Sequence, residues 1–204
     1  MSVIPDGNRR YASKYGLELK EAYSVGMSNC IKTIAWAKKK GIKNIVFYVY
    51  SKDNYFKRPV IERELILRLF QDKAMEALIT PLEEVDSDIT GVKLTFVGEM
   101  SKLPPNLCST LQELSAKTKG NNEIEASFAI LSSSPVSNNK RGVYPHPIDL
   151  MFRSGGFRRL SDFLPQNHAY AELYFEDKLW PEVKEEDLDR AYHWYNSQER
   201  NLGQ

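Results

Sequence analysis

The sequence predicts an α/β fold, a single domain with a central, mostly parallel sheet flanked by helices. Short β-branched and aromatic runs, such as residues 45–50, alternate along the chain with longer amphipathic segments, such as residues 60–79. The 204 residues are 42% hydrophobic and 27% charged, which suits one domain (residues 1–204) with a core of ordinary size. We therefore expect strands joined by crossover helices and a sheet that is covered on both faces.

The individual elements follow from runs of strand-forming residues and from apolar residues at helical spacing. The expected strands are residues 3–4, 45–50, 94–97, 124–131, 148–152 and 173–175. The expected helices are residues 9–15 starting at Asn8, 19–39, 60–79, a segment opened by Pro105, and 185–200. A polar loop is expected before Pro59, and residues 132–146, rich in Ser, Asn and Pro, are expected to form a mobile loop.

Composition limits the partners and the compartment. The net charge of +1 gives no reason to expect a nucleic-acid or membrane-surface partner. Cys30 and Cys108 are far apart and suggest neither a disulfide framework nor a thiolate metal site. No apolar run approaches the roughly 20 residues that span a bilayer, and Met1 leads into a polar turn without a signal-peptide pattern. We therefore expect a cytoplasmic protein with no transmembrane segment.

Three polar clusters follow directly after expected strands, at residues 6–10, 51–54 and 153–156. In open parallel sheets, ligands bind beyond the carboxyl ends of the strands. The three clusters are far apart in the sequence, but this rule places them at one edge of the sheet. We therefore expect them to form a common site.

The cluster that begins at Arg153 has the character of an anion site. Gly155 and Gly156 allow turns, and a close approach of backbone to ligand, that a Cβ would prevent. Three arginines and two serines lie within nine residues, and the planar guanidinium matches phosphate oxygens in pairs. A phosphate or diphosphate is the ligand that these residues favour. The alternative is a surface loop whose charges are simply solvated.

The cluster that begins at Asp6 indicates that a metal ion binds beside the phosphate. Gly7 and Asn8 open a helix whose free N–H groups can hold phosphate oxygens, and Arg9 and Arg10 add positive charge. A carboxylate beside a phosphate repels it unless a cation lies between them. Mg²⁺ fits this position, because it prefers one or two carboxylates together with phosphate oxygens and water. The structural alternative for Asp6 is a helix N-cap, and the two roles can coexist.

The same stretches resemble the motifs of the cis-prenyltransferases, the undecaprenyl diphosphate synthase-like family. Residues 4–12 resemble the signature MDGNRRYA, and residues 51–59 resemble FSTENW followed by RP. Residues 153–163 and 169–175 resemble RTGGExRLSNF and AYAELYF. The motifs appear in the family's order and span nearly the whole chain. The resemblance implies a homodimer-forming α/β fold in which an allylic diphosphate donor reacts with isopentenyl diphosphate in the presence of Mg²⁺.

The resemblance also implies roles for individual residues. The residues implied to hold the donor diphosphate and its metal are Asp6, Gly7, Asn8, Arg9, Arg10 and Arg58. The residues implied to hold the acceptor diphosphate are Arg153, Arg159 and Ser161. Ser51 and Asn54 match residues near the reacting carbons, and Glu172 matches a glutamate that contributes to the metal, partly across the subunit contact.

The departures from the family pattern concern the surroundings of these residues. Phe157 stands where the family usually has glutamate, and Tyr23 where many members have histidine. Between Leu131 and Pro145 the chain lacks an NYGGR-like motif and a further helix, so that only the Ser/Asn-rich loop remains. A missing helix beside the site is expected to change the acceptor pocket, which argues against a long polyprenyl product.

The resulting hypothesis is an active prenyltransferase that uses short allylic donors, with isopentenyl diphosphate or a non-standard acceptor. One alternative is a catalytically silent partner subunit of a heteromeric enzyme; such subunits tend to lose the aspartate of the first motif, whereas Asp6 is present. A diphosphate hydrolase is a weaker alternative, because His146, His168 and His193 are scattered and no nucleophile is placed beside them.

Overall fold

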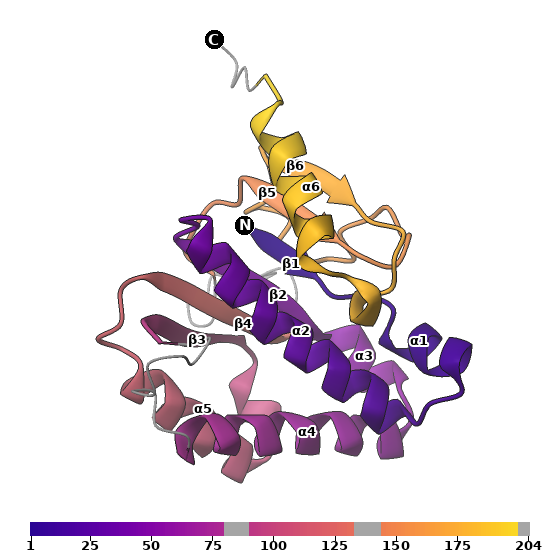
Figure 1. The fold of residues 1–204 in the computed structure, drawn as a ribbon. Coiled ribbons are helices and arrows are strands. Elements are labelled where there is room, and N and C mark those ends of the chain that lie inside the picture. Colours follow the sequence, from indigo (N-terminus) through magenta and orange to yellow (C-terminus); the bar gives the residue numbers. More distant parts are fainter. Residues whose placement is uncertain (80–89, 133–143, 200–204) are drawn as a thin grey trace.

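The computed structural model describes residues 1–79, 90–132 and 144–199, and the α/β prediction is confirmed (Figure 1). Six parallel strands form one sheet in the order β3-β4-β2-β1-β5-β6. The strands are β1 (Ser2–Ile4), β2 (Asn44–Ser51), β3 (Val92–Gly98), β4 (Ile124–Ser132), β5 (Leu150–Arg153) and β6 (Glu172–Phe175). The short β1 lies at the centre because it pairs with both β2 and β5.

The helices differ from the sequence prediction at two places. They are α1 (Asn8–Tyr15), α2 (Leu19–Lys39), α3 (Lys52–Lys57), α4 (Val60–Ile79), α5 (Pro105–Lys117) and α6 (Glu185–Asn196). The polar loop expected before Pro59 is wrong, because α3 forms there: the Ser51 hydroxyl caps it by accepting a hydrogen bond from the Asn54 N–H. Helix α6 ends at Asn196, earlier than predicted. Most of the expected loop 132–146 lies outside the described residues.

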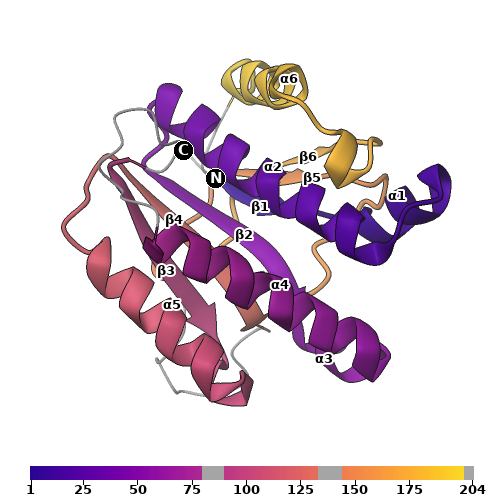
Figure 2. The same ribbon diagram turned by 60° about the horizontal axis from the view of Figure 1, so that its bottom comes forward.

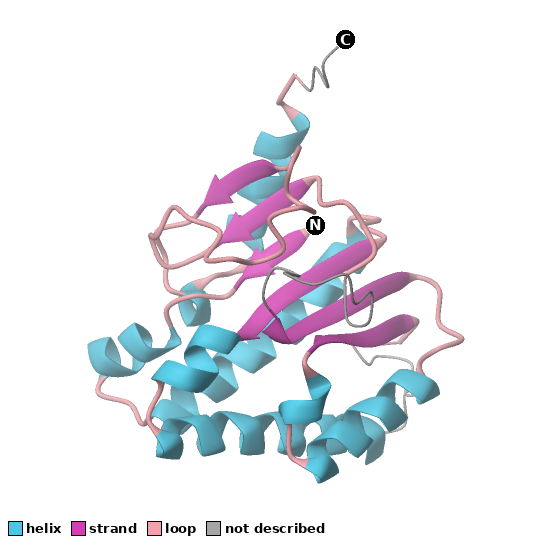
Figure 3. Cartoon of the chain, turned by 180° about the vertical axis from the view of Figure 1, so that it is seen from behind, coloured by secondary structure: helices cyan, strands magenta, loops and turns pink. Residues whose placement is uncertain are grey.

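The alternation of side chains along the strands divides the core between the two faces of the sheet. Phe47 and Phe152 belong to the larger apolar cluster, to which residues of α2, α4, α5 and α6 contribute. Helices α2 and α6 cross this face of the sheet (Figures 1 and 2). Val46 and Met151 point the other way, where they join Phe163 in a second cluster. Part of this second face is covered by non-helical chain instead of helix (Figure 3).

Asp187, which is fully buried, holds the first turn of α6 in place. Its carboxylate accepts hydrogen bonds from the Lys184 N–H at 2.8 Å and from Lys178 Nζ at 2.7 Å, and it also pairs with Arg190. Burial by itself raises the pKa of this carboxyl, but these hydrogen bonds outweigh it and hold the pKa below its ordinary value. Asp187 therefore stabilises the fold as an anion.

We expect Asp187→Asn to lower the free energy of unfolding at pH 7 by about 2 kcal/mol, because Lys178 and Arg190 are half exposed and the pair is only partly desolvated. Because the folded pKa is depressed, this contribution is present above the unfolded pKa of about 3.9 and disappears as the pH falls through the folded pKa. Urea unfolding between pH 3 and 7 measures it, with the exposed neighbour Glu186→Gln as control. A difference between wild type and Asp187→Asn that does not shrink in acid would contradict the assignment.

Within the described residues, no helix combines the length and the apolar character needed to cross a membrane.

Candidate active site

The carboxyl ends of β1 and β5 are joined by backbone and hydroxyl hydrogen bonds. The Asp6 N–H donates to the Ser154 hydroxyl oxygen at 3.1 Å, and the same hydroxyl donates to the Asp6 carbonyl at 3.0 Å. The Trp180 N–H donates to that carbonyl as well, at 2.9 Å. Residues 148 positions apart in the chain are thereby fixed side by side, as the strand-end rule predicts.

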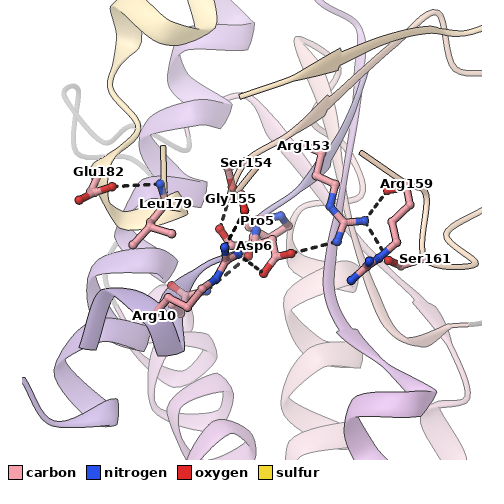
Figure 4. Close-up of polar contacts among 11 residues, drawn as sticks. Pro5, Asp6, Arg10, Arg153, Ser154, Gly155, Arg159, Ser161, Leu179 and Glu182 are labelled. Carbon is pink, nitrogen blue, oxygen red and sulfur yellow. Dashed lines mark hydrogen bonds and ion pairs between the residues drawn. The ribbon is translucent and has the colours of Figure 1, made fainter. Parts of the chain in front are cut away.

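The Asp6 carboxylate lies between two arginines, Arg10 on α1 and Arg153 at the end of β5 (Figure 4). Its Oδ1 accepts from Arg10 Nη2 at 3.2 Å, and its Oδ2 accepts from Arg153 Nη2 at 2.9 Å. Asp6 does not cap α1, because Gly7 is the N-cap residue and no side chain caps the helix. The carboxylate instead links the polar cluster of residues 6–10 to the polar cluster of residues 153–156.

Arg153 is a buried arginine with an incomplete set of partners. It is 3% exposed, and its Nη1 donates to the Ser161 hydroxyl at 2.8 Å and to the Arg159 carbonyl. Its buried Nε–H has no hydrogen-bond partner within the described part of the chain. Ser161 adopts a left-handed backbone conformation with φ of 53°. Such strain is concentrated at functional sites, and an unpaired buried donor is costly unless a ligand satisfies it.

Gly155 makes the close approach of the two strand ends possible. Its φ is +87°, and its carbonyl accepts from Arg10 Nη1 at 2.7 Å. A Cβ at this position would lie 2.6 Å from Arg10 Nη2 and 2.9 Å from the Asp6 carbonyl oxygen. The glycine therefore leaves space that Arg10 occupies.

We expect Gly155→Ala to lower the free energy of unfolding by about 2 kcal/mol and to reduce turnover about tenfold, because the methyl group displaces Arg10 as well as straining the backbone. Gly156→Ala is the matched control: its φ is also positive, at +77°, but the nearest atom to its Cβ is 3.6 Å away. Thermal unfolding and steady-state kinetics separate the two effects. Equal losses in both variants would mean that backbone strain alone, and not Arg10, is responsible.

A second polar cluster surrounds Glu62, a buried residue in the first turn of α4. Its Oε1 accepts from the Tyr23 hydroxyl at 2.8 Å and from Arg58 Nη1 at 3.0 Å, and Arg9 Nε lies 3.6 Å away. Arg58 Nη1 also donates to the Tyr23 hydroxyl oxygen at 2.5 Å. Arg9 and Arg58, both predicted to hold the donor diphosphate, therefore converge on one carboxylate.

One cavity of about 980 Å³ collects nearly all of the predicted residues. Its walls include Asp6, Gly7, Asn8, Arg9, Arg10, Ser51, Asn54, Arg58, Arg153, Arg159 and Ser161. Glu172 is the exception: it begins β6 opposite Leu150, whereas Asp6 follows the far end of β1. The structure therefore does not bring Glu172 to Asp6 within one chain.

Comparison with known proteins agrees with the geometry. The undecaprenyl diphosphate synthase (Prenyltransf) family model matches residues 4–135 and 135–203. The chain belongs to this family of prenyltransferases. It is 33% identical, over 100% of its length and 94% of the relative's, to the tritrans,polycis-undecaprenyl-diphosphate synthase (geranylgeranyl-diphosphate specific) of Pyrobaculum aerophilum. It is 27% identical to an isoprenyl transferase of Ralstonia nicotianae, over 100% of this chain and 86% of that one.

Solved structures share the fold of this family member. A probable undecaprenyl diphosphate synthase from Campylobacter jejuni superposes with a TM-score of 0.76 at 25% identity, covering 100% of this chain and 97% of that chain. Lavandulyl diphosphate synthase from Lavandula x intermedia superposes with a TM-score of 0.86 at 23% identity, with the same coverage. The chain therefore shares the fold of these prenyltransferases.

The residues at the cavity fit a metal that arrives with a diphosphate. Asp6 offers a partly exposed carboxylate, and Mg²⁺ commonly takes one or two carboxylates plus phosphate oxygens and water. Among the described residues, no group of three or more His, Cys, Asp or Glu side chains could hold a metal ion by itself. A ligand set completed by the substrate is the arrangement that this donor chemistry supports.

Three further side chains of the cavity wall remain protonated near neutral pH. Burial raises the pKa of Tyr48 to about 12 and that of the Cys30 thiol to about 12. Burial is also the main reason that the pKa of Tyr23 is raised. None of these groups is therefore available as a base at neutral pH.

Sequence reasoning missed Glu62 and Tyr48. Glu62 stands four residues after Arg58, which is the helical spacing of an ion pair, and this signal could have identified it. Tyr48 lies on β2 and stacks on Phe163 with ring centroids 4.3 Å apart. In a strand composed of aromatic and β-branched residues, no sequence signal distinguishes the ring that lines a cavity.

Proposed function

We propose that the protein transfers a short allylic prenyl group from its diphosphate, with Mg²⁺, to isopentenyl diphosphate or a different small acceptor. The observation that carries the proposal is the Asp6 carboxylate, which bridges Arg10 and Arg153 and so joins two arginine-rich half-sites in one cavity. A condensation of two diphosphates needs two such half-sites side by side. Family membership and the names of the relatives support the same reaction class.

The donor half-site consists of the start of α1 and the Arg58 side chain. Arg9, Arg10 and Arg58 present guanidinium N–H groups where the charge of a leaving diphosphate develops as the allylic C–O bond breaks. Asp6 would hold the Mg²⁺, which when bound supplies additional positive charge to that leaving group. Glu62 holds Arg9 and Arg58 in place until the diphosphate takes over these contacts.

The acceptor half-site consists of the end of β5 and the segment that follows it. Arg153, Arg159 and Ser161 hold the acceptor diphosphate and so keep its double bond close to the allylic carbon. When the new C–C bond forms, a proton leaves the carbon next to the cationic centre. The released diphosphate is the proton acceptor that we assign, with Asn54 in the same cavity wall as a polar relay.

We infer a homodimer, in which Glu172 acts at the metal of the second copy. Within one chain Glu172 and Asp6 lie at opposite ends of their strands, so an intrachain contact does not account for the motif. Equilibrium sedimentation measures the assembly. Glu172→Gln is expected to raise the Mg²⁺ concentration needed for half-maximal turnover without dissociating the dimer.

Product analysis tests the proposed function. The full chain is incubated with isopentenyl diphosphate and, in separate reactions, dimethylallyl, geranyl or geranylgeranyl diphosphate, each with Mg²⁺ or with EDTA. We expect a prenylated diphosphate with the shorter donors, formed only with Mg²⁺. In parallel, each donor is incubated without isopentenyl diphosphate, so that a product from two donor molecules is detected. No magnesium-dependent product from any pair would refute the proposal.

A further inference from the structure

The ring of Phe157 is surrounded by guanidinium groups from both half-sites. The ring centroid lies 4.7 Å from the Arg10 Cζ, 4.4 Å from the Arg159 Cζ and 6.0 Å from the Arg153 Cζ. The side chain lines the cavity, and the residue is 42% exposed. Contacts at these distances are attractive because the face of an aromatic ring is electrostatically negative.

The ring gives these cations a partner without adding a negative charge. Arg10 and Arg153 already share the carboxylate of Asp6, so their mutual repulsion is only partly compensated. A carboxylate at position 157 would pair with the same guanidiniums, but it would cancel positive charge and occupy their N–H donors. A ring attracts the face of a guanidinium and leaves its N–H edge available to an anion.

We propose that Phe157 is a positioning residue that enables the acceptor half-site to hold a diphosphate through its arginines without a metal ion. The inference rests on the proposed function for the identity of the ligand. The buried Nε–H of Arg153, which has no partner in the described part of the chain, is a donor that such a ligand satisfies. Magnesium then serves the donor half-site at Asp6, and the acceptor diphosphate binds independently of it.

Calorimetric titration of the full chain with inorganic pyrophosphate in EDTA tests the inference directly. We expect the wild type to bind, and Phe157→Leu to bind about tenfold more weakly, because three cation–π contacts are lost. Phe157→Trp restores the ring and is expected to bind within about threefold of the wild type. Phe157→Glu is expected to lose binding in EDTA and to recover part of it when Mg²⁺ is supplied.

Two further variants locate the effect. Phe56→Leu is the matched control, because Phe56 is an exposed ring with its own cation contact, Lys102 Nζ at 5.0 Å, outside the cavity wall. It should leave pyrophosphate binding unchanged. In an Arg159→Ala background, Phe157→Leu should cost less than in the wild type, because one of the guanidiniums that the ring positions is absent.

The outcomes that overturn the inference are distinct from those that refute the proposed function. A wild type that binds no pyrophosphate in EDTA, or a Phe157→Leu variant that binds as tightly as the wild type, overturns it. If Phe157→Leu fails to fold in a thermal melt, the comparison of Phe157→Trp with Phe157→Glu decides: equal affinities in EDTA overturn it. If the chain binds pyrophosphate as expected but forms no prenylated product, the proposed function is refuted and the inference about pyrophosphate binding stands.

Discussion

Replacing Asp6 by asparagine is expected to reduce turnover about 1,000-fold or more at saturating substrate and Mg²⁺. Asparagine keeps the shape of the side chain, but its single oxygen can accept from only one of Arg10 and Arg153, and its NH₂ group is a donor. The hydrogen bonds between Asp6 and Ser154 use the Asp6 backbone, so the local fold should survive. What disappears is the negative charge that holds these two guanidiniums at opposite oxygens and that recruits the metal. The loss should therefore fall mainly on kcat, because the metal that this charge recruits would stabilise the leaving diphosphate in the transition state.

The matched control is Asp72→Asn, the same substitution at an exposed position of α4 outside the cavity wall. It should leave turnover and unfolding temperature unchanged. A thermal melt of Asp6→Asn separates a loss of fold from a loss of chemistry. If turnover stayed within tenfold of the wild type, Asp6 would not be the catalytic carboxylate, and a partner subunit would have to supply it.

The fold was largely predictable because the local signals agree with the global architecture. Helix α2 occupies Leu19–Lys39 as predicted, since its apolar positions keep helical spacing and Gly41 follows its end. Helix α3 was missed because Lys52–Lys57 has no buried residue and therefore no apolar periodicity to detect. Its start signals are the Ser51 cap and Asp53 in the first turn, which a polar loop of the same composition would also contain.

Most of the residues that the sequence singles out line one cavity, but the contacts between them could not be predicted. The strand-end rule brings Asp6 and Arg153 together because β1 and β5 are neighbours in the sheet. The contacts of Tyr23 with Glu62 and Arg58 could not be predicted in the same way, because they depend on how α2 packs against α4. Contacts between helices are set by packing of side chains that are remote in the sequence, and composition does not reveal them.

The position of Glu172 illustrates a different limit. Its motif indicates a role at the metal, whereas the sheet register places it away from Asp6 in the same chain. Both observations are consistent if the residue acts in the second subunit of a dimer, as the proposed function requires. The family resemblance already implies a contribution across the subunit contact, whereas the residue pattern alone does not show which copy of the chain supplies Glu172.

Replacing Arg153 by lysine is expected to lower kcat/KM for the acceptor about 100-fold, although the positive charge is kept. The guanidinium donates simultaneously to Asp6, to Ser161 and to the Arg159 carbonyl, and its Nε–H remains for a ligand. A single ammonium group cannot reproduce this planar arrangement of donors. Because the residue is 3% exposed, water cannot replace the lost contacts, and the acceptor diphosphate loses a fixed partner.

Steady-state kinetics with varied acceptor and saturating donor measure this loss of kcat/KM. It should appear mainly as an increase in the KM of the acceptor. Arg158→Lys is the matched control, because Arg158 lies on the same segment but does not line the cavity. Varying the donor instead gives the second comparison: its KM should change by less than about threefold, since Arg9 and Arg58 lie in the other half-site. Equal increases in both KM values would mean that Arg153 supports the whole cavity through Asp6 and does not belong to the acceptor half-site alone.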